Sequence, residues 1–217
     1  MAKVRLGLLG PIIVLAGAAV AGVAIWYMLG AKPEAGEVID TIALDDTAKL
    51  VIRKEARGTR SFLELHERGA LKWQALIPPY AGAPGRPAVA WSDRAVTVRV
   101  DRESGRAEVF AFARDTARKV GALRLAPDKE PIKIHPSGPI TLTDHQRSFE
   151  IVTGPDWGLL IAIDLATGEG VWKVDLGKTA VTDAGVAAGR VWIVQGGDRR
   201  TFDAATGRES IATQPVN

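Results

Sequence analysis

The chain has 217 residues, a length that predicts one domain or at most two. It carries 28 Lys and Arg against 25 Asp and Glu, a formal net charge of +3, and 47% of its residues are hydrophobic. This balance excludes the strong basic field of a nucleic-acid-binding protein and is too apolar for a wholly disordered chain. No cysteine is present, which excludes disulfides, thiolate metal sites, cysteine nucleophiles and a lipid anchor on cysteine.

The first apolar segment is long enough to cross a membrane. No residue from Leu6 to Ala31 is charged, and a helix of that length spans the ~30 Å hydrocarbon core of a bilayer. We therefore expect a cytoplasmic N-terminus over residues 1–5, a transmembrane helix over residues 6–31 and a polar linker over residues 32–40. The alternative is a secretory signal peptide cleaved near Ala31, although its apolar region would be unusually long.

The charges that flank this segment predict its orientation. Lys3 and Arg5 precede the span, whereas Lys32 is followed by several acidic residues. The positive-inside rule therefore places the N-terminus in the cytoplasm. In a bacterium, residues 41–217 would form a periplasmic domain anchored to the inner membrane.

Small residues four positions apart occur within the expected span. Gly17 is followed by Ala21, and Ala18 by Gly22. Such pairs let a second helix approach closely, so Gly17, Ala21 and Gly22 are candidate partner contacts. The alternative is a generic anchor that is simply rich in alanine and glycine.

After the linker, the sequence is typical of an all-β domain. Runs of β-branched and alternating residues, such as 95–100, 148–152 and 190–194, are separated by Gly, Asp and Pro with no helical period. One unit of strand, polar turn and strand recurs four times, about 40–50 residues apart, which is typical of four-stranded propeller blades. Its turn position falls at Gly69, Ala117, Gly168 and Gly207.

The physical role of each residue in the unit follows from its type. The Asp side chain can accept hydrogen bonds from backbone N–H groups two residues on, and Gly supplies a positive φ. Trp offers a large apolar surface that suits packing between blades. The expected turn and packing residues are Gly69, Trp73, Asp164, Thr167, Gly168, Trp172, Asp203, Thr206 and Gly207. Leu65 and Ala113 replace the Asp in the first two units, and Gly121 replaces the second Trp.

This pattern of strand, Asp-x-x-Thr-Gly-x-x-x-Trp, resembles the quinoprotein-type (PQQ-like) β-propeller repeat over about residues 41–214. The resemblance implies a small or partial β-propeller of about four blades, of the non-catalytic, BamB-like scaffold type. Four units are compatible with a closed four-bladed ring, with an open arc, or with half of a larger ring that a second chain completes.

The sequence points to no catalytic, cofactor or metal site. The resemblance implies that catalytic members hold a quinone in a larger ring, and the alcohol dehydrogenases among them also have a vicinal cysteine pair, which this chain lacks. The histidines, His66, His135 and His145, have no zinc-binding spacing, and no nucleophile elbow or phosphate-binding loop is present. We therefore expect no enzymatic activity.

Together these features predict a membrane-anchored periplasmic scaffold, an accessory subunit of a bacterial membrane protein complex. Its partners would be the bilayer, other membrane or periplasmic proteins and, if a second chain completes the ring, another copy of itself. Trp91 and Trp157, in or near turns, are candidate partner contacts. Three alternatives remain: an accessory subunit of a respiratory or photosynthetic electron-transfer complex, a hydrolase or sugar-active propeller enzyme, and a soluble secreted protein.

Overall fold

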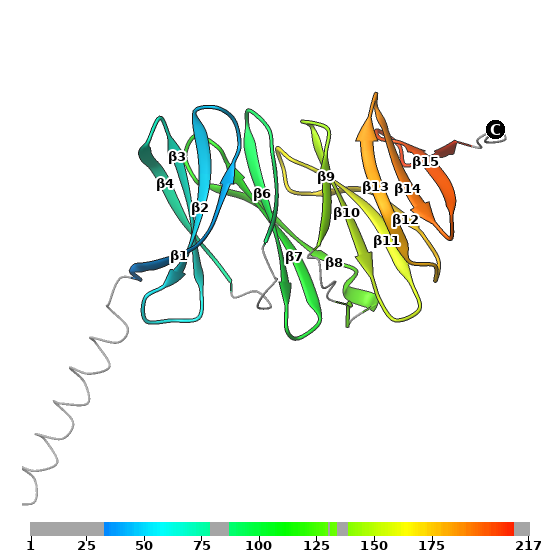
Figure 1. Cartoon of the computed structure of the whole chain (residues 1–217), viewed down its shortest axis with the longest axis horizontal. Coiled ribbons are helices and arrows are strands. Elements are labelled where there is room, and N and C mark those ends of the chain that lie inside the picture. The colour runs from blue at the N-terminus through cyan, green and yellow to red at the C-terminus, as the bar shows by residue number, and fades with distance from the viewer. Residues whose placement is uncertain (1–32, 79–86, 130, 134–138, 211–217) are drawn as a thin grey trace, which may run out of the picture.

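The computed structural model describes residues 33–78, 87–129, 131–133 and 139–210. Across these ranges sixteen strands form four antiparallel sheets, each of four strands that follow one another in sequence order (Figure 1). Such meanders are typical of propeller blades because each strand pairs with its neighbour in the chain. The predicted all-β class with four repeating units is confirmed.

The strands have the following bounds. The first sheet contains β1 (Ala35–Ala43), β2 (Ala48–Glu55), β3 (Ser61–Glu67) and β4 (Ala70–Ile77). The second contains β5 (Ala88–Trp91), β6 (Ala95–Arg102), β7 (Arg106–Ala113) and β8 (Lys119–Leu125). The third contains β9 (Ile140–Thr143), β10 (Arg147–Thr153), β11 (Gly158–Asp164) and β12 (Gly170–Asp175), after a short 3-10 helix, η1 (Pro127–Lys129). The fourth contains β13 (Val181–Ala187), β14 (Arg190–Gln195), β15 (Asp198–Asp203) and β16 (Glu209–Ser210).

The first strand begins earlier than the sequence predicts. Residues 32–40 are expected to form a linker, whereas β1 starts at Ala35 and pairs with β2 as far as Ala43. Two register shifts on either side of Val38 interrupt the alternation of the strand. Because a bulge destroys the two-residue period, the segment does not show a strand pattern in the sequence.

The described residues contain no helix that is both long enough and apolar enough to span a bilayer. The expected transmembrane segment, residues 6–31 with Gly17, Ala21 and Gly22, lies outside the described residues.

One face of each sheet packs on the next sheet. Leu50 and Ile52 of β2 share a buried cluster with Val96, Val98 and Val100 of β6. Side chains alternate along a strand, so these valines leave the other face of the second sheet free to contact the third sheet.

The same arrangement repeats along the chain. Val109 of β7 shares a buried cluster with Val152 and Ile161 of the third sheet. On the opposite face of the third sheet, Phe149 packs in one cluster with Ile193 of β14. Each middle sheet is therefore covered on both faces by its neighbours.

The four sheets form an open row rather than a closed ring. Figure 1 shows the first and fourth sheets at opposite ends of the row. Within the ranges described above, no buried hydrophobic cluster joins these two sheets. Of the three arrangements compatible with four repeats, the closed four-bladed ring is therefore wrong for the single chain, whereas an open arc and half of a larger ring both fit.

A glycine closes the contact between the second and third sheets. A Cβ atom on Gly121 would lie 2.1 Å from the carbonyl oxygen of Thr167 and 2.9 Å from the Cα atom of Gly168. The backbones of β8 and of the β11–β12 turn therefore touch where the repeat would otherwise carry a tryptophan.

We expect Gly121→Ala to destabilise the protein by about 1–3 kcal/mol, because its methyl group forces rigid backbone apart. Urea unfolding of the full-length protein in mild detergent, followed by tryptophan fluorescence, measures this change. Gly170→Ala is the matched control, since its Cβ would meet only Leu123 Cδ2 at 3.4 Å. Equal effects of the two substitutions would contradict the close approach at Gly121.

Candidate functional site

The two clearest repeat turns share one hydrogen-bond pattern. Asp164 Oδ1 accepts from the backbone N–H groups of Ala166 and Thr167 at 2.9 and 3.0 Å. Asp203 Oδ1 accepts from Ala205 and Thr206 in the same way, at 3.1 and 2.8 Å. The Thr206 hydroxyl also donates to Asp203 Oδ1 at 2.8 Å, and this bond, followed by the backbone bond from Thr206, holds the pKa of Asp203 below its usual range.

The glycine of each turn has the backbone conformation that the motif requires. Gly168 and Gly207 have φ values of 72° and 69°, and each donates its N–H to the carbonyl oxygen of the turn's Asp at 2.8 Å. Ala117, at this position in the second sheet, also has a positive φ of 58°. A side chain in this conformation is strained, which is why glycine suits the position better.

The first unit turns differently from the other three. Arg68 and Gly69 alone connect β3 to β4, with φ values of 51° and 82°, as in a two-residue hairpin turn. In this sheet Glu67 lies opposite Ala48, the register position that Asp164 holds in the third sheet. Aligning the four units by sequence instead assigns that position to Leu65, because the sequence does not show that this turn is shorter.

Two tryptophans fasten their sheets to the next turn. Trp73 Nε1 donates to the carbonyl oxygen of Arg114 at 2.6 Å, and Trp172 Nε1 donates to that of Ala204 at 3.1 Å. The Trp172 ring lies against Gly207, where an added Cβ would approach it to 2.7 Å. Sheets one and two, and sheets three and four, are therefore joined by both an aromatic ring and a hydrogen bond.

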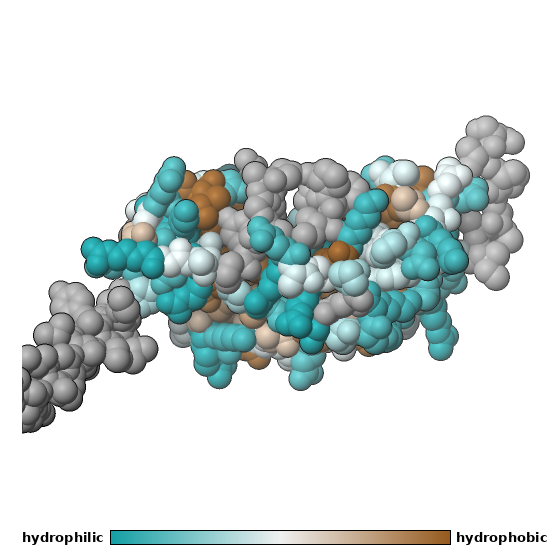
Figure 2. All heavy atoms as spheres, turned by 90° about the horizontal axis from the view of Figure 1, so that it is seen from below, coloured by the Kyte–Doolittle hydropathy of each residue, from teal (hydrophilic) through white to brown (hydrophobic). Residues whose placement is uncertain are grey.

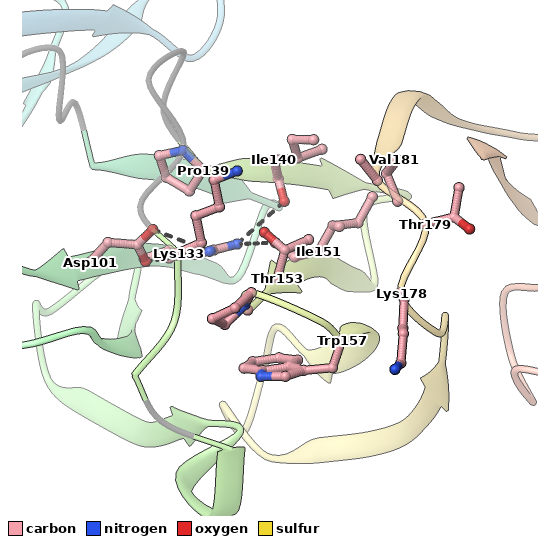
Figure 3. A pocket seen from close by; sticks show the side chains of 14 residues that line it. Asp101, Lys133, Pro139, Ile140, Ile151, Thr153, Trp157, Lys178, Thr179 and Val181 are labelled. Carbon is pink, nitrogen blue, oxygen red and sulfur yellow. Dashed lines mark hydrogen bonds and ion pairs between the residues drawn. The ribbon is translucent and has the colours of Figure 1, made fainter. Parts of the chain in front are cut away.

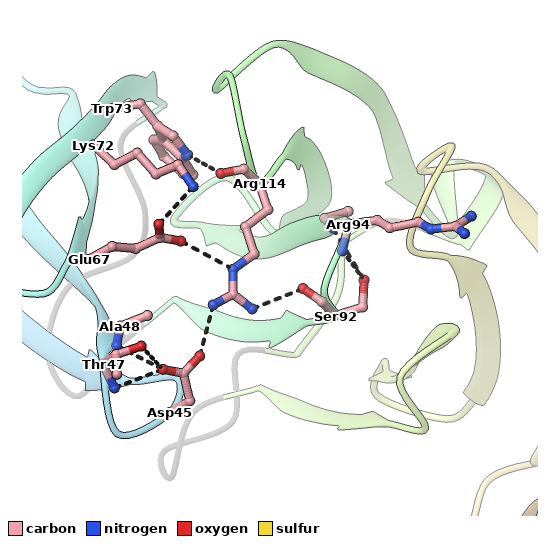
Figure 4. Close-up of polar contacts among 10 residues, drawn as sticks. Asp45, Thr47, Ala48, Glu67, Lys72, Trp73, Ser92, Arg94 and Arg114 are labelled. Atoms are coloured by element: carbon pink, nitrogen blue, oxygen red, sulfur yellow. Dashed lines mark hydrogen bonds and ion pairs between the residues drawn. The ribbon is translucent and has the colours of Figure 1, made fainter.

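The Arg114 side chain adds charge to the first of these joints. Its Nη2 atom pairs with Asp45 Oδ2 at 2.8 Å, and its Nη1 atom donates to the Ser92 carbonyl oxygen at 3.3 Å (Figure 4). Its Nε atom lies 3.7 Å from Glu67 Oε1. The guanidinium thus links two turns of the first sheet to the second, and it holds the pKa of Asp45 well below its usual range.

A small hollow opens where the second, third and fourth sheets meet. Its volume is about 140 Å³. Figure 3 shows the side chains that line it. The β10–β11 turn contributes to it, and this turn lies at the lower end of the sheets in Figure 1. Figure 2 shows that this end of the molecule is largely hydrophilic. The hollow is lined by Arg99, Asp101, Lys133, Pro139, Ile140, Ile151, Thr153, Gly154, Pro155, Trp157, Lys178, Thr179, Ala180 and Val181.

Arg99 lines the base of this hollow and is almost fully buried, with 3% of its side chain exposed. Its Nε and Nη2 atoms donate to the two Asp101 carboxylate oxygens at 2.9 and 3.2 Å. Its Nη1 atom donates to the Ile151 carbonyl oxygen at 2.8 Å and lies 3.4 Å from Glu150 Oε2. Burial raises the pKa of Glu150, although the charge of Arg99 and the hydrogen bond from Thr141 oppose this shift.

The remaining polar side chains of the hollow stand at its sides. Lys133 and Lys178 extend from two different segments, and their amino groups point away from each other (Figure 3). Both lysines are exposed, and neither forms an ion pair with any residue that the structure describes. At the bottom of the hollow the charge of Arg99 is balanced by Asp101, whereas at its sides the two lysines pair with no described carboxylate.

The sequence indicates only part of this site. Trp157 is a candidate partner contact and lines the hollow, whereas Trp91 lies half-buried in β5. Arg99 and the two lysines come from segments far apart in sequence, so the sequence alone does not show that they line one hollow. The one local signal is the charge of Arg99 and Asp101 within the otherwise valine-rich strand β6.

His66 and His145 lie in the described part of the chain, and His135 lies outside it. His66 Nε2 is 3.0 Å from Glu64 Oε2, which also accepts from Arg53 Nε at 3.0 Å. Across residues 33–78, 87–129, 131–133 and 139–210, no three His, Asp or Glu side chains are grouped so as to hold a metal ion.

Comparison with known proteins gives only structural likenesses. No protein-family model matches the sequence, and no curated protein matches it. BamB from Moraxella catarrhalis is 16% identical, with a TM-score of 0.48, over 77% of this chain and 50% of that one. A europium-containing methanol dehydrogenase is 16% identical, with a TM-score of 0.45, over 67% of this chain and 26% of that one.

The propeller of Dos1 is 11% identical, with a TM-score of 0.47, over 78% of this chain and 46% of that one. The chain thus spans half or less of the length of these three structures. These likenesses concern the β-propeller fold alone.

We expect Trp172→Phe to lower the free energy of unfolding by about 1 kcal/mol, because the ring stays but its hydrogen bond to Ala204 is lost. Urea unfolding measures the change. Trp192→Phe is the control, since the Trp192 indole makes no hydrogen bond with a described residue. The same loss in the control would mean that ring volume, not the hydrogen bond, matters.

We expect the Asp45→Asn substitution to make the free energy of unfolding depend less on pH in the acidic range. The lowered pKa of Asp45 means that its contribution is present above the pKa of the unfolded carboxyl, about 3.9, and is lost as the pH falls toward the folded value. The variant keeps the acceptor for Thr47 and Ala48 but loses the charge that faces Arg114.

Unfolding midpoints should therefore differ most at pH 7 and converge toward pH 2. Asp46→Asn is the control, because the Asp46 side chain pairs with no described residue. A difference between wild type and Asp45→Asn that stays constant with pH would contradict a charge-based role for Asp45.

Proposed function

We propose that the chain is a scaffold anchored in the bacterial inner membrane, with its β domain in the periplasm, and that it serves as a non-catalytic accessory subunit of a membrane protein complex. The observation that carries this proposal is that side-chain hydrogen bonds and an ion pair hold adjacent sheets together. Trp73 and Trp172 each bond to the backbone of the next sheet, and Arg114 links three segments. A framework held in this way keeps partner-facing side chains at fixed relative positions, which lowers the entropy cost of binding.

The anchor in this proposal is residues 6–31. Their uncharged composition and the basic residues before them support a single span with the N-terminus in the cytoplasm. The span would confine the β domain to the membrane surface, where its partners are other membrane or periplasmic proteins.

The chemistry of the hollow favours binding over hydrolysis. Glycoside hydrolases place two carboxyl groups on either side of the scissile bond. Among the described residues that line this hollow, Asp101 is the one carboxylate, and both of its oxygens accept from Arg99. This arrangement supports a binding role rather than the sugar-active alternative.

The test is purification of the tagged full-length chain from native membranes in mild detergent, with mass spectrometry of the proteins that accompany it. A tagged chain of residues 1–40 is the control, because it retains the expected anchor without most of the β domain. We expect a stoichiometric set of membrane proteins with the full chain alone. A lone, monodisperse chain would contradict the scaffold function.

The same preparation separates the alternatives. Cofactor-bearing redox subunits in the set would favour an electron-transfer complex. Two copies of the chain per complex would mean that a second copy completes the ring. A mature N-terminus near residue 31 would instead indicate a secreted protein.

A further inference from the structure

We propose that the first sheet packs on the fourth sheet of a second copy of this chain, so that two copies close one ring. Two copies of four sheets each lie within the four to eight blades typical of propellers, whereas three copies would exceed that range. A head-to-tail contact of this kind closes into a ring and leaves no end face exposed. Such a dimer is independent of the scaffold function proposed above.

Exposed large hydrophobic side chains are concentrated on the first sheet. Of the five among the described residues, four belong to its edge strands β1 and β4, namely Val38, Ile39, Leu71 and Leu76. An exposed apolar patch of this kind is typical of a surface that another protein covers.

The two leucines lie on the outer face of the first sheet, which none of the other described sheets covers (Figure 1). Leu71 and Leu76 stand opposite His66 and Phe62 of β3. Because side chains alternate along a strand, these two β3 residues point away from Leu65, which is buried against the second sheet. The leucines, 53% and 37% exposed, therefore face the end of the row.

The middle sheets carry no large hydrophobic side chain at these positions. In the first sheet the two leucines are the residues two before and three after Trp73. The same offsets from the tryptophan position give Lys119 and Arg124 in the second sheet, and Gly170 and Asp175 in the third. The apolar outer face is thus particular to the sheet at the end of the row.

The outer face of the fourth sheet is formed by Trp192, Val194 and Arg199. Val191 and Ile193 of β14 are buried against the third sheet, so the residues that alternate with them point outward. Arg199 lies opposite Val194, and its guanidinium carbon is 4.4 Å from the centroid of the Trp192 ring. It forms no ion pair with any residue that the structure describes.

The contact between the second and third sheets shows how two such faces meet. Arg99 and Val109 lie opposite each other on the second sheet, as Glu150 and Ile161 do on the third. Arg99 approaches Glu150 to 3.4 Å, and Val109 shares a buried cluster with Ile161. The ion pair thus joins the second strands of the two sheets, and the apolar contact joins their third strands.

The two end faces have the same arrangement with the strands exchanged. On the fourth sheet, Val194 is on the second strand and Arg199 opposite it on the third. On the first sheet, Val51 is on the second strand and Glu64 opposite it on the third. Stacking these faces as the second and third sheets stack would place Arg199 against Glu64 and Val194 against Val51. The exchange on one face is therefore matched by the exchange on the other.

The matching positions lie at the same level in their sheets. Arg199 precedes the turn aspartate of its sheet by four residues, as Val109 precedes Ala113 at the corresponding turn position of the second sheet. Glu64 and Ile161 each lie opposite the residue that follows the tryptophan of their sheet. The ion pair between copies would therefore form where the apolar contact lies between the second and third sheets.

Glu64 has room for one more donor. Its Oε2 atom accepts from Arg53 Nε and His66 Nε2, both at 3.0 Å, whereas among the described residues its Oε1 atom accepts from Gln74 Nε2 alone, at 2.9 Å. A carboxylate offers about four acceptor positions. The guanidinium of Arg199 from a second copy can therefore donate to Oε1.

The first measurement is the number of copies in the purified full-length protein, by native mass spectrometry from mild detergent at increasing protein concentration. We expect a species of two chains of 23.1 kDa each, in equilibrium with the single chain. A single chain at every concentration, or a series of ever larger assemblies, would overturn the closed ring.

Substitutions of exposed side chains then locate the contact. Leu71→Lys and Arg199→Glu, on the two end faces, should each raise the Kd of the dimer by about tenfold or more. Val171→Lys and Arg118→Glu are the matched controls, because both side chains are exposed but lie on the middle sheets, and each should change the Kd by less than about twofold. The thermal unfolding midpoint of each variant checks its fold.

Introduced cysteines test the head-to-tail arrangement, since the chain has none of its own. Leu71→Cys with Thr201→Cys puts one thiol on each end sheet, at opposite ends of the row (Figure 1). A short bismaleimide should therefore join copies of this double variant and leave each single variant unlinked. Cross-linked single variants would mean that like faces meet, which would overturn the proposal.

A dimer that persists in both Leu71→Lys and Arg199→Glu would also overturn the proposal and would point to contact through residues 6–31. The scaffold function is judged separately, by the proteins that accompany the chain from native membranes. Partner proteins on a single wild-type chain would support the scaffold function and overturn the ring. Two copies without any partner protein would do the reverse.

Discussion

The structure depends on one constraint, which is that each sheet carries an apolar face that becomes buried only against a neighbouring sheet. In the second sheet, Val96, Val98 and Val100 face one neighbour while Val109 faces the other. A single four-stranded sheet of this kind cannot be stable in water, because at least one apolar face would stay exposed. Packing each sheet on the next buries these faces. Trp73, Trp172, Arg114 and Arg99 then add hydrogen bonds between the packed sheets.

Much of this arrangement could be predicted from the sequence because it is encoded locally. The turn at Asp164 and Gly168 closes within five residues, so its side-chain bonds and positive φ follow from the motif itself. Trp172 follows at a fixed distance along the next strand. The alternation over residues 95–100 likewise identifies a strand, and repetition of the unit gives the number of sheets.

The features that escaped prediction depend on distant segments or on irregular backbone. The bulges of β1 hide a strand within the expected linker, and the short turn at Gly69 shifts the first unit against the others by two residues. Arg99, Lys133 and Lys178 line one hollow only because three sheets pack together. Neither the spacing nor the composition of the sequence indicates such long-range contacts. The sequence likewise does not show whether the first and fourth sheets pack against each other to close a ring.

The contact at Gly121 also lies at the boundary between two halves of the domain, each of which contains two sheets joined by a tryptophan. The first two sheets are contiguous in sequence and are fastened by Trp73, and the last two are contiguous and fastened by Trp172. Each pair can therefore assemble from its own stretch of chain as that stretch emerges. The boundary between them has no such tryptophan; Gly121 brings bare backbone together there, and Arg99 of the second sheet separately contacts Glu150 of the third. Contacts across this boundary need both halves in place, so they join segments that are farther apart in sequence than the contacts within each half.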